Sequence, residues 1–418
     1  MNGVLMLPMQ RRSIECRSIL TLMVAFCLPP TAATNTIAEE PAEMPAYSAE
    51  LVFPLHSQHN HAPGIVECPN GDLLVSWYRG SGERSADDVA VWGARRRAGT
   101  TNWTDAFLMA DTPGFPDCNT CMMVDAQNQL WLFWPVILAN TWESCLTHFK
   151  VAHNADAADE SGAPVWDRSD VILMKPDDFS DEGLALLDRE LESLPTETVK
   201  TLESKLKVLR ERLSDRLLQR LGWQPRCKPT VLPSGRILLP LYSDTYSFSI
   251  MAISDDGGKS WYAGKPLMGF GNIQPAVMRR DDGVLIAYMR ENGPRGRIRV
   301  AASGDDGISW GPVGESTLPN PGSGLDGVRL HNGHWLLVYN DTTDGRRSLA
   351  VSVSQDEGRT WQQTRHLEQH DSGAYHYPAV IQDRSGTIHV VYSYFVEDGK
   401  SMKHAAFNEA WVLQSSAQ

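Results

Sequence analysis

The sequence lacks three features that would each indicate a particular class of protein. It has no excess of basic residues, because 38 lysines and arginines are outnumbered by 51 aspartates and glutamates, for a formal net charge of −13. This balance argues against a nucleic acid or an anionic membrane as partner, so an anionic ligand would require a local basic pocket. No second cysteine pair completes a zinc site with Cys118 and Cys121, which leaves a local disulfide or two buried thiols. The apolar run from Ile19 to Leu28 is too short to span a bilayer.

The N-terminus has the composition of an export signal. Three arginines precede the short apolar run, and small residues follow it up to Ala33. We therefore predict a signal peptide over residues 1–33 and a polar linker over residues 34–48, in a secreted or periplasmic protein. Removal of the signal peptide leaves five cysteines, and an odd number implies at least one unpaired thiol.

A histidine cluster opens the predicted domain. His56, His59 and His61 lie close together in the chain, and strand geometry puts His59 and His61 on one face. Three neighbouring histidines suggest a metal site, but no carboxylate or cysteine completes one at a recognisable spacing. We predict histidines that hydrogen-bond in a pocket or stabilise the fold, and neither a metal nor another cofactor.

The second half of the chain contains one eight-residue pattern three times. The copies are Ser254-Asp-Asp-Gly-Gly-Lys-Ser-Trp261, Ser303-Gly-Asp-Asp-Gly-Ile-Ser-Trp310 and Ser354-Gln-Asp-Glu-Gly-Arg-Thr-Trp361. In a hairpin turn the Asp and the Ser or Thr hydrogen-bond backbone N–H groups, the Gly adopts a positive φ, and the Trp covers the turn. The copies begin about 50 residues apart, the length of one four-stranded blade, which predicts an all-β protein built as a β-propeller.

One segment departs from this strand pattern. Between residues 177 and 222, leucines recur at three- and four-residue spacing from Leu202 to Leu217, and Gly222 follows as a stop. We predict a helical hairpin inserted between strands of one blade, because its subtraction restores the period of about 50 residues. Its apolar stripe either packs against the propeller or binds a partner.

The repeated pattern resembles the Asp-box (BNR repeat) of the sialidase (neuraminidase) superfamily. The resemblance extends over most of residues 55–405, apart from the helical segment. It implies a six-bladed β-propeller, which we place at residues 49–412. Asp-boxes also occur in propellers that are not sialidases, so the motif indicates the fold more directly than the activity.

The resemblance also implies roles for particular residues. In sialidases a tyrosine nucleophile opens one strand, and Tyr377 matches its position. The acid/base aspartate follows the first hairpin, where this chain has Asp87 and Asp88. The second and third arginines of the family's carboxylate-binding triad correspond to Arg297 and Arg346. These residue types suit an acidic sugar, because arginine binds carboxylates bidentately and a neutral tyrosine is not repelled by them.

Two residues of the family pattern are missing. The first triad arginine belongs to an Arg-Ile-Pro tripeptide, and the matching tripeptide here is His61-Ala62-Pro63, so His61 is the substrate-binding candidate in its place. The glutamate that pairs with the tyrosine is expected in the strand that begins near Pro275. Residues 277–279 read Val-Met-Arg, so this glutamate is absent or displaced.

Three further substrate-binding candidates follow from their places on strands. Arg226 and Lys228 alternate with Cys227, so both are expected to project toward the propeller centre. Arg290 ends a strand and faces either solvent or the central pocket. Tyr375 shares a strand face with Tyr377, whereas His376 lies opposite unless the chain is irregular there.

Together these features predict a secreted, sialidase-like glycoside hydrolase of the exo-α-sialidase type that acts on an acidic glycan. One alternative is a polysaccharide lyase on a uronate polymer, in which arginine neutralises the carboxylate and a tyrosine or histidine removes the α-proton. The other is a carbohydrate-binding propeller without catalysis.

Overall fold

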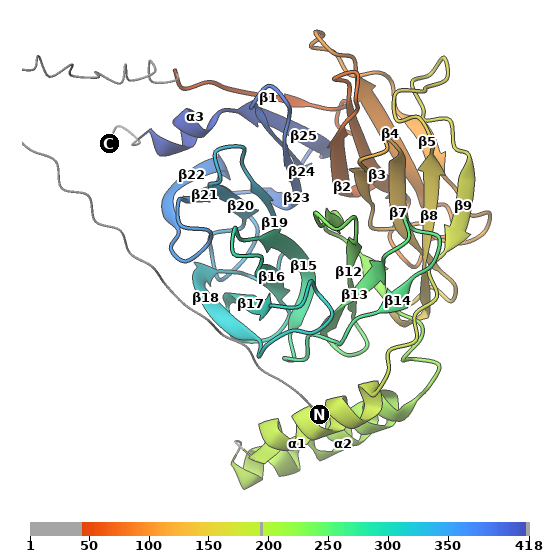
Figure 1. Ribbon diagram of the computed structural model, residues 1–418, viewed down its shortest axis with the longest axis vertical. Coiled ribbons are helices and arrows are strands. Elements are labelled where there is room, and N and C mark those ends of the chain that lie inside the picture. Colours follow the sequence, from red (N-terminus) through yellow and green to blue (C-terminus); the bar gives the residue numbers. More distant parts are fainter. Residues whose placement is uncertain (1–43, 193–194, 415–418) are drawn as a thin grey trace, which may run out of the picture. The chain divides into compact units, whose positions relative to one another are not determined.

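The chain folds as a ring of antiparallel sheets (Figure 1). The structure is a computed structural model that describes residues 44–192 and 195–414. Within these residues the strands form six sheets, five with four strands and one with five. The predicted six-bladed β-propeller with a helical insertion is therefore confirmed. The predicted signal peptide and most of the predicted linker lie outside the described residues.

The first three blades use consecutive strands of the chain. Blade 1 contains β2 (His59–Glu67), β3 (Leu73–Gly80), β4 (Ala90–Arg96) and β5 (Phe107–Ala110). Blade 2 contains β6 (Cys121–Val124), β7 (Leu130–Ile137), the short 3-10 helix η1 (Trp142–Ser144), β8 (Cys145–Ala152) and β9 (Arg168–Val171). Blade 3 contains β10 (Gln224–Pro225), β11 (Thr230–Val231), β12 (Ile237–Ser243), β13 (Phe248–Ser254) and β14 (Tyr262–Ala263).

The last three blades complete the ring. Blade 4 contains β15 (Asn272–Arg279), β16 (Leu285–Glu291), β17 (Arg297–Ser303) and β18 (Gly314–Pro319). Blade 5 contains β19 (Asp326–Arg329), β20 (Trp335–Tyr339), β21 (Ser348–Ser354) and β22 (Gln362–Gln369). Blade 6 contains β23 (Ala374–Gln382), β24 (Ile388–Val396), β25 (Gly399–Phe407) and β1 (Tyr47–Leu51), and the helix α3 (Glu409–Leu413) follows it. The first strands of blades 1, 2, 4, 5 and 6 contact first strands of neighbouring blades (β2 with β6 and β23, β19 with β15 and β23), so they line the centre of the ring.

The three Asp-box turns are held by one recurring set of hydrogen bonds. Asp256, Asp305 and Asp356 each accept from the backbone N–H and the hydroxyl of the Ser or Thr four residues later. Gly307 has a φ of 82°, and a Cβ at this position would lie 2.8 Å from the Leu238 side chain of blade 3. The motif thus stabilises turns against neighbouring blades, as its sequence predicts.

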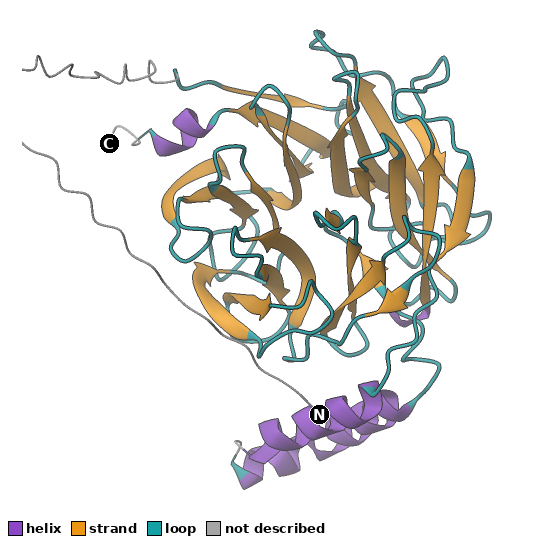
Figure 2. Ribbon diagram, in the orientation of Figure 1, coloured by secondary structure: helices purple, strands orange, loops and turns teal. Residues whose placement is uncertain are grey.

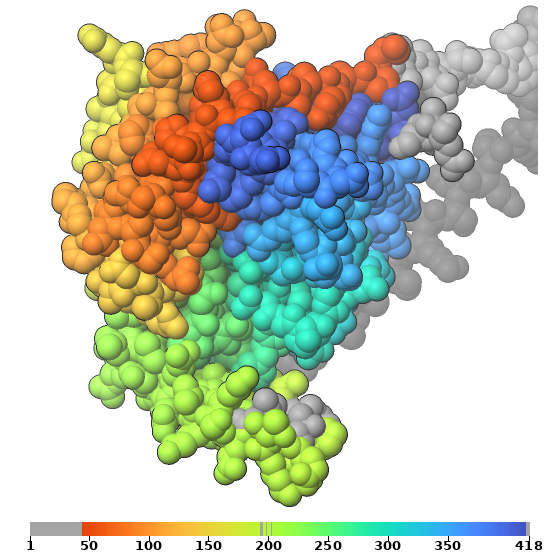
Figure 3. Space-filling view, turned by 180° about the vertical axis from the view of Figure 1, so that it is seen from behind, coloured from red at the N-terminus to blue at the C-terminus, as the bar shows by residue number. Residues whose placement is uncertain are grey.

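The two ends of the propeller chain meet in blade 6. Strand β1 pairs antiparallel with β25, with Glu50 opposite His404, and Figure 3 shows the N-terminal residues in red beside the C-terminal residues in blue. His404 Nδ1 lies 3.4 Å from Glu50 Oε1, and His404 Nε2 lies 2.9 Å from His389 Nδ1. His389 Nε2 in turn lies 3.0 Å from Asp383 Oδ2. This row of four polar side chains links β1 to the other strands of blade 6.

The closure of the ring is expected to weaken in acid. Burial lowers the pKa of His404 to about 4, and the hydrogen bond with His404 is the main influence that lowers the pKa of Glu50. The unfolded chain therefore binds protons that the folded chain excludes. The contribution of His404 to stability is complete above about pH 6.5 and is lost as the pH falls toward 4, by up to about 3 kcal/mol. Urea unfolding at pH 7 and at pH 4.5 measures this loss.

The matched variants are His404→Gln and, as an exposed control, His153→Gln. The first is expected to reduce the difference in unfolding free energy between the two pH values, and the second to leave it unchanged. A wild-type protein that is equally stable at both pH values would contradict the role given to His404.

The helical insertion lies between the last strand of blade 2 and the first strand of blade 3 (Figure 2). The prediction that it interrupts the strands of one blade is therefore wrong, because it connects two complete blades. It contains α1 (Phe179–Glu192) and α2 (Thr196–Ser214), which pack against each other. Phe179 and Leu213 are buried in one core cluster with Trp223 and Tyr246 of the propeller. The apolar stripe therefore packs against the propeller, which is the first of the two roles predicted for it.

The five cysteines of the described chain, at positions 68, 118, 121, 145 and 227, are all buried free thiols. Of the two arrangements predicted for Cys118 and Cys121, the structure has the buried thiols. None of the described helices combines the length and the apolar character that crossing a membrane requires.

Candidate active site

An irregularity shared by the first strands of three blades aims side chains at the propeller centre. Ala62, Gln274 and Tyr377 each precede a proline and have φ values of 53°, 56° and 54°, and the strand pairing shifts register at each point. Positive φ is uncommon for residues with a side chain and costs free energy. Such bulges redirect side chains and recur next to active sites.

Tyr377 of blade 6 lies among three arginines that come from three other blades. The guanidinium carbons of Arg226, Arg290 and Arg346 lie 5.0, 5.9 and 5.6 Å from the centre of its ring. Arg290 Nη1 donates to Tyr377 Oη at 2.6 Å. Arg226 is buried beside the ring and donates from Nη2 to the carbonyl of Pro378 at 2.7 Å. The structure thus gathers four of the predicted site residues.

The three arginines form no ion pair with any carboxylate of the described residues. Nε of Arg226 and Nε of Arg290 are buried without a hydrogen-bond acceptor in the described chain. An uncompensated buried charge costs several kcal/mol, and arginine binds a carboxylate through two parallel hydrogen bonds. The arrangement is therefore suited to an anionic group supplied by a ligand.

Gln274 of blade 4 faces the Tyr377 hydroxyl, although it is not among the site residues predicted from the sequence. Its Nε2 lies 3.2 Å from Tyr377 Oη and 3.1 Å from Tyr242 Oη, while its Oε1 is buried without a partner in the described chain. The residue paired with the tyrosine is thus an amide, which donates a hydrogen bond but cannot take up a proton at neutral pH. The signal in the sequence is Gln274-Pro275, which repeats the Tyr377-Pro378 pair.

Two buried histidines pack against Tyr377. The ring centres of His61 and His376 lie 4.3 and 5.7 Å from that of Tyr377, and His61 Nδ1 lies 2.7 Å from the Ser393 hydroxyl. Burial lowers the pKa of both histidines well below its usual value, and the neighbouring arginines act in the same direction. His61 therefore stands in the cluster as a neutral ring and not as a cation.

The two aspartates expected as acid/base groups lie outside this cluster. Asp88 accepts from the backbone N–H of Ser81 at 3.0 Å and from its hydroxyl at 2.8 Å, which closes their loop. Asp87 accepts from Asn140 Nδ2 at 2.8 Å and so joins two neighbouring loops. Both aspartates are exposed. Their carboxylates hold loops together, and the structure does not bring them to Tyr377.

Glu83, in the same loop, is the carboxylate that borders the cluster. Its Oε1 accepts from Tyr78 Oη at 2.8 Å and lies 3.1 Å from His59 Nε2. Tyr78 is buried in the same apolar cluster as Tyr377. Burial favours a higher pKa for Glu83, but the hydrogen bonds with His59 and Tyr78 outweigh it and hold the pKa below its usual value.

Arg297 and Tyr375 also lie outside the cluster. Arg297 is exposed and donates from Nη1 to the carbonyl of Thr317 at 2.7 Å. Tyr375 packs in the core between blades 5 and 6, with its ring 5.2 Å from that of Tyr394. The bulge at Tyr377 breaks strand alternation, so Tyr375 and Tyr377 face different surroundings although they are two residues apart.

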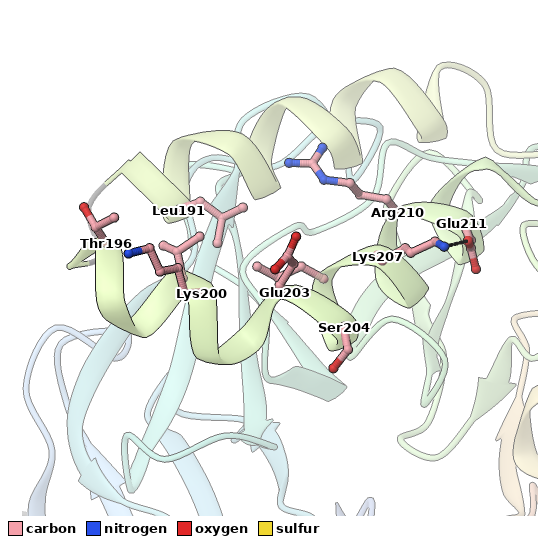
Figure 4. Close-up of a pocket in the computed structure, with 10 residues that line it drawn as sticks. Leu191, Thr196, Lys200, Glu203, Ser204, Lys207, Arg210 and Glu211 are labelled. Carbon is pink, nitrogen blue, oxygen red and sulfur yellow. Dashed lines mark ion pairs between the residues drawn. The ribbon is translucent and has the colours of Figure 1, made fainter.

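A separate hollow lies between the two helices of the insertion (Figure 4). Apolar side chains such as Leu191 and Leu206 and the charged Lys200, Glu203 and Arg210 line it. All of its lining residues come from the insertion, and it shares none with the Tyr377 cluster. The described part of the chain also contains no group of three or more His, Cys, Asp or Glu side chains that could hold a metal ion.

Comparisons with known proteins connect this geometry to a family. Residues 221–390 match the model of the BNR repeat-like domain, and this range includes the three arginines, Gln274 and Tyr377. A sialidase from Micromonospora viridifaciens is 28% identical over 174 residues, which are 39% of this chain and 26% of that protein. The matched part thus spans about a quarter of the length of that curated relative.

Solved structures agree on the fold. The NanB sialidase from Streptococcus pneumoniae superposes with a TM-score of 0.64 at 11% identity, over 87% of this chain and 71% of that one. A Hadza microbial sialidase superposes with a TM-score of 0.61 at 18% identity, over 86% of this chain and 67% of that one. The propeller therefore shares its fold with these sialidases, and residues 221–390 match the BNR repeat-like domain.

Proposed function

We propose that this protein is an exported enzyme that hydrolyses glycosides of acidic sugars, as an exo-α-sialidase does. The observation that carries this proposal is the set of three guanidinium groups within 6 Å of the Tyr377 ring, none of them paired with a carboxylate of the described chain. A sugar carboxylate supplies the missing negative charge. The relatives named above are described as sialidases, which supports an acidic sugar as substrate.

Tyr377 is the nucleophile in this proposal. Sialidases with a tyrosine nucleophile are an exception to the use of two carboxylates in glycoside hydrolysis. A tyrosine is not repelled by the substrate carboxylate, and Arg290 donates to its oxygen at 2.6 Å. Arg226 and Arg346 add positive charge on the same ring, so negative charge that develops on the phenol oxygen is stabilised.

A uronate polysaccharide lyase is the second candidate, and Gln274 favours it. An amide beside Tyr377 cannot accept the proton that a nucleophilic tyrosine must lose. The neutral His61 and His376 beside the same ring are suited to remove an α-proton from a uronate whose carboxylate the arginines neutralise. Elimination needs no covalent intermediate, so it does not require a carboxylate at position 274.

The test is turnover of a fluorogenic sialoside and a panel of uronate polymers by wild-type protein and Tyr377→Phe. The loss of the hydroxyl is expected to lower kcat on the sialoside by about 10²- to 10⁴-fold, whereas uronate elimination with a histidine as the base is expected to persist. The control is Tyr375→Phe, which removes a hydroxyl outside the cluster and is expected to leave kcat unchanged.

Each of the two substrate classes tests one of the candidate activities. Sialoside cleavage supports the hydrolase, and a product that absorbs near about 230 nm on uronate polymers supports the lyase. Folded wild-type protein that binds these sugars without turning any of them over would contradict both activities and leave a carbohydrate-binding propeller.

A further inference from the structure

Asp244 is a second carboxyl group at the border of the Tyr377 cluster. It follows β12 directly and is half-buried in the loop that leads to β13. Gln224 Nε2 donates to its Oδ2 at 2.9 Å, and Gln224 Oε1 accepts from Asn119 Nδ2 at 3.0 Å. Both amide side chains are buried. The orientation of the Asp244 carboxyl group is therefore fixed from inside the propeller.

The same hydrogen bonds continue to the reacting tyrosine. Asn119 Nδ2 also donates to Tyr242 Oη at 3.1 Å. Gln274 Nε2 lies 3.1 Å from that oxygen and 3.2 Å from Tyr377 Oη. Asp244 on blade 3 is thus connected to Tyr377 on blade 6 without a break. Fully connected buried networks of this kind fix the relative positions of their members.

The helical insertion supports the loop that carries Asp244. Tyr246, two residues further on, donates from its hydroxyl to the carbonyl of Arg212 in α2 at 2.9 Å. Its ring lies 4.8 Å from that of Phe179 at the start of α1. Leu213 is buried in the same cluster. The insertion therefore helps to position a site loop, which gives this segment a role in the site.

The surroundings of Asp244 and Glu83 shift the pKa values of the two carboxyl groups in opposite directions. Burial is the largest influence on Asp244 and raises its pKa; Glu143 acts with it, whereas Arg290, Arg84 and the Gln224 hydrogen bond act against it. The pKa of Glu83 is lowered instead. A carboxyl group whose pKa is raised in this way is suited to hold a proton that it then donates.

We propose that Asp244 is the proton donor of the site. This inference rests on the proposed glycoside hydrolysis. Asp244 protonates the departing glycosidic oxygen while Tyr377 Oη bonds to the anomeric carbon. The proton that the Tyr377 hydroxyl loses passes to water, because the described partners of its oxygen are Gln274 and Arg290. The bond between the anomeric carbon and the departing oxygen breaks, and its electron pair stays on that oxygen.

The second step restores both groups. Water attacks the anomeric carbon and gives its proton to the Asp244 carboxylate. The bond to Tyr377 Oη breaks, and the phenol oxygen recovers its proton from water. Arg290 stabilises this oxygen as it departs, through the hydrogen bond of 2.6 Å. The sum of the two steps is hydrolysis, with no other reactant.

The experiment compares two glycosides of the same acidic sugar in wild-type protein and Asp244→Asn. One carries 4-methylumbelliferone, a leaving group that needs little protonation, and the other carries lactose, which needs protonation. For Asp244→Asn, kcat/KM is expected to fall about 10²-fold or more on the lactose glycoside and less than about fivefold on the activated one. The basic limb of the wild-type pH profile is expected to disappear in the variant.

The control is Asp88→Asn, which changes an exposed loop carboxylate and is expected to lower neither rate. If Asp244→Asn does not fold, Gln224→Met removes the hydrogen bond to Asp244 and is expected to shift the same limb. Equal losses on both glycosides would overturn the role of Asp244 while the proposed function stands. Failure of wild-type protein to cleave either glycoside would overturn the proposed function and this inference with it.

Discussion

Replacement of Gln274 by glutamate is expected to raise the rate of sialoside hydrolysis by about 10²-fold. The amide nitrogen of Gln274 lies 3.2 Å from Tyr377 Oη, so a side chain of equal length puts a carboxylate oxygen within hydrogen-bond distance of the hydroxyl. A positioned base contributes about 10²- to 10⁴-fold when it removes a proton in the transition state. The added negative charge lies near Arg290, which also donates to Tyr377 Oη. Initial rates on a fluorogenic sialoside measure the effect.

Gln274→Met separates this chemical effect from a change of packing. Methionine is similar in length and has no group that accepts a proton, so we expect no gain from it. A fall in sialoside hydrolysis for Gln274→Glu would show that Tyr377 does not act as a nucleophile. A simultaneous loss of uronate elimination would then favour the lyase, because a carboxylate at this point competes with the substrate for the arginines.

The fold could be predicted because its signals are local in sequence. Each Asp-box turn closes through hydrogen bonds between residues two to four positions apart, such as that from Ser309 Oγ to Asp305 Oδ2 at 2.5 Å. The helical insertion was equally visible, since leucine spacing needs only the helical period. These patterns do not require knowledge of which blades meet at the centre.

Site residues could be predicted only where their positions on the predicted strands place them near the propeller centre. Tyr377, Arg226, Arg290 and Arg346 come together as their positions near the centre suggest. Alternation along a strand placed Tyr375 with Tyr377, but the positive φ of 54° at Tyr377 breaks that alternation.

Three site residues were missed because long-range contacts define them. Gln274 belongs to the site through hydrogen bonds to residues 32 and 103 positions away. Asp244 is linked to the site through Asn119 and Gln224, which come from two other segments of the chain. Glu83 is the member of its acidic loop that reaches Tyr78, while Asp87 and Asp88 bind other loop residues. Sequence spacing alone cannot decide among three carboxylates of one loop.

Replacement of Arg290 by methionine is expected to remove most of the affinity for an acidic sugar. Arg290 is directed at the Tyr377 oxygen and has no carboxylate partner in the described chain. Removal of one partner of a buried, hydrogen-bonded charge pair costs about 2–4 kcal/mol, which is roughly 30- to 1,000-fold in Kd. The matched control is Arg297→Met, since Arg297 is exposed and donates to the carbonyl of Thr317. The control is expected to bind as the wild-type protein does.

The measurement that tests the central claim most directly is calorimetric titration of the wild-type protein with N-acetylneuraminic acid, glucuronic acid and their methyl esters. It asks whether the arginines around Tyr377 bind a sugar through its carboxylate, whichever reaction follows. We expect at least one acid to bind about 10²-fold more tightly than its ester, and Arg290→Met to remove that preference while Arg297→Met keeps it. Equal affinity for each acid and its ester, or a preference that survives in Arg290→Met, would contradict the account.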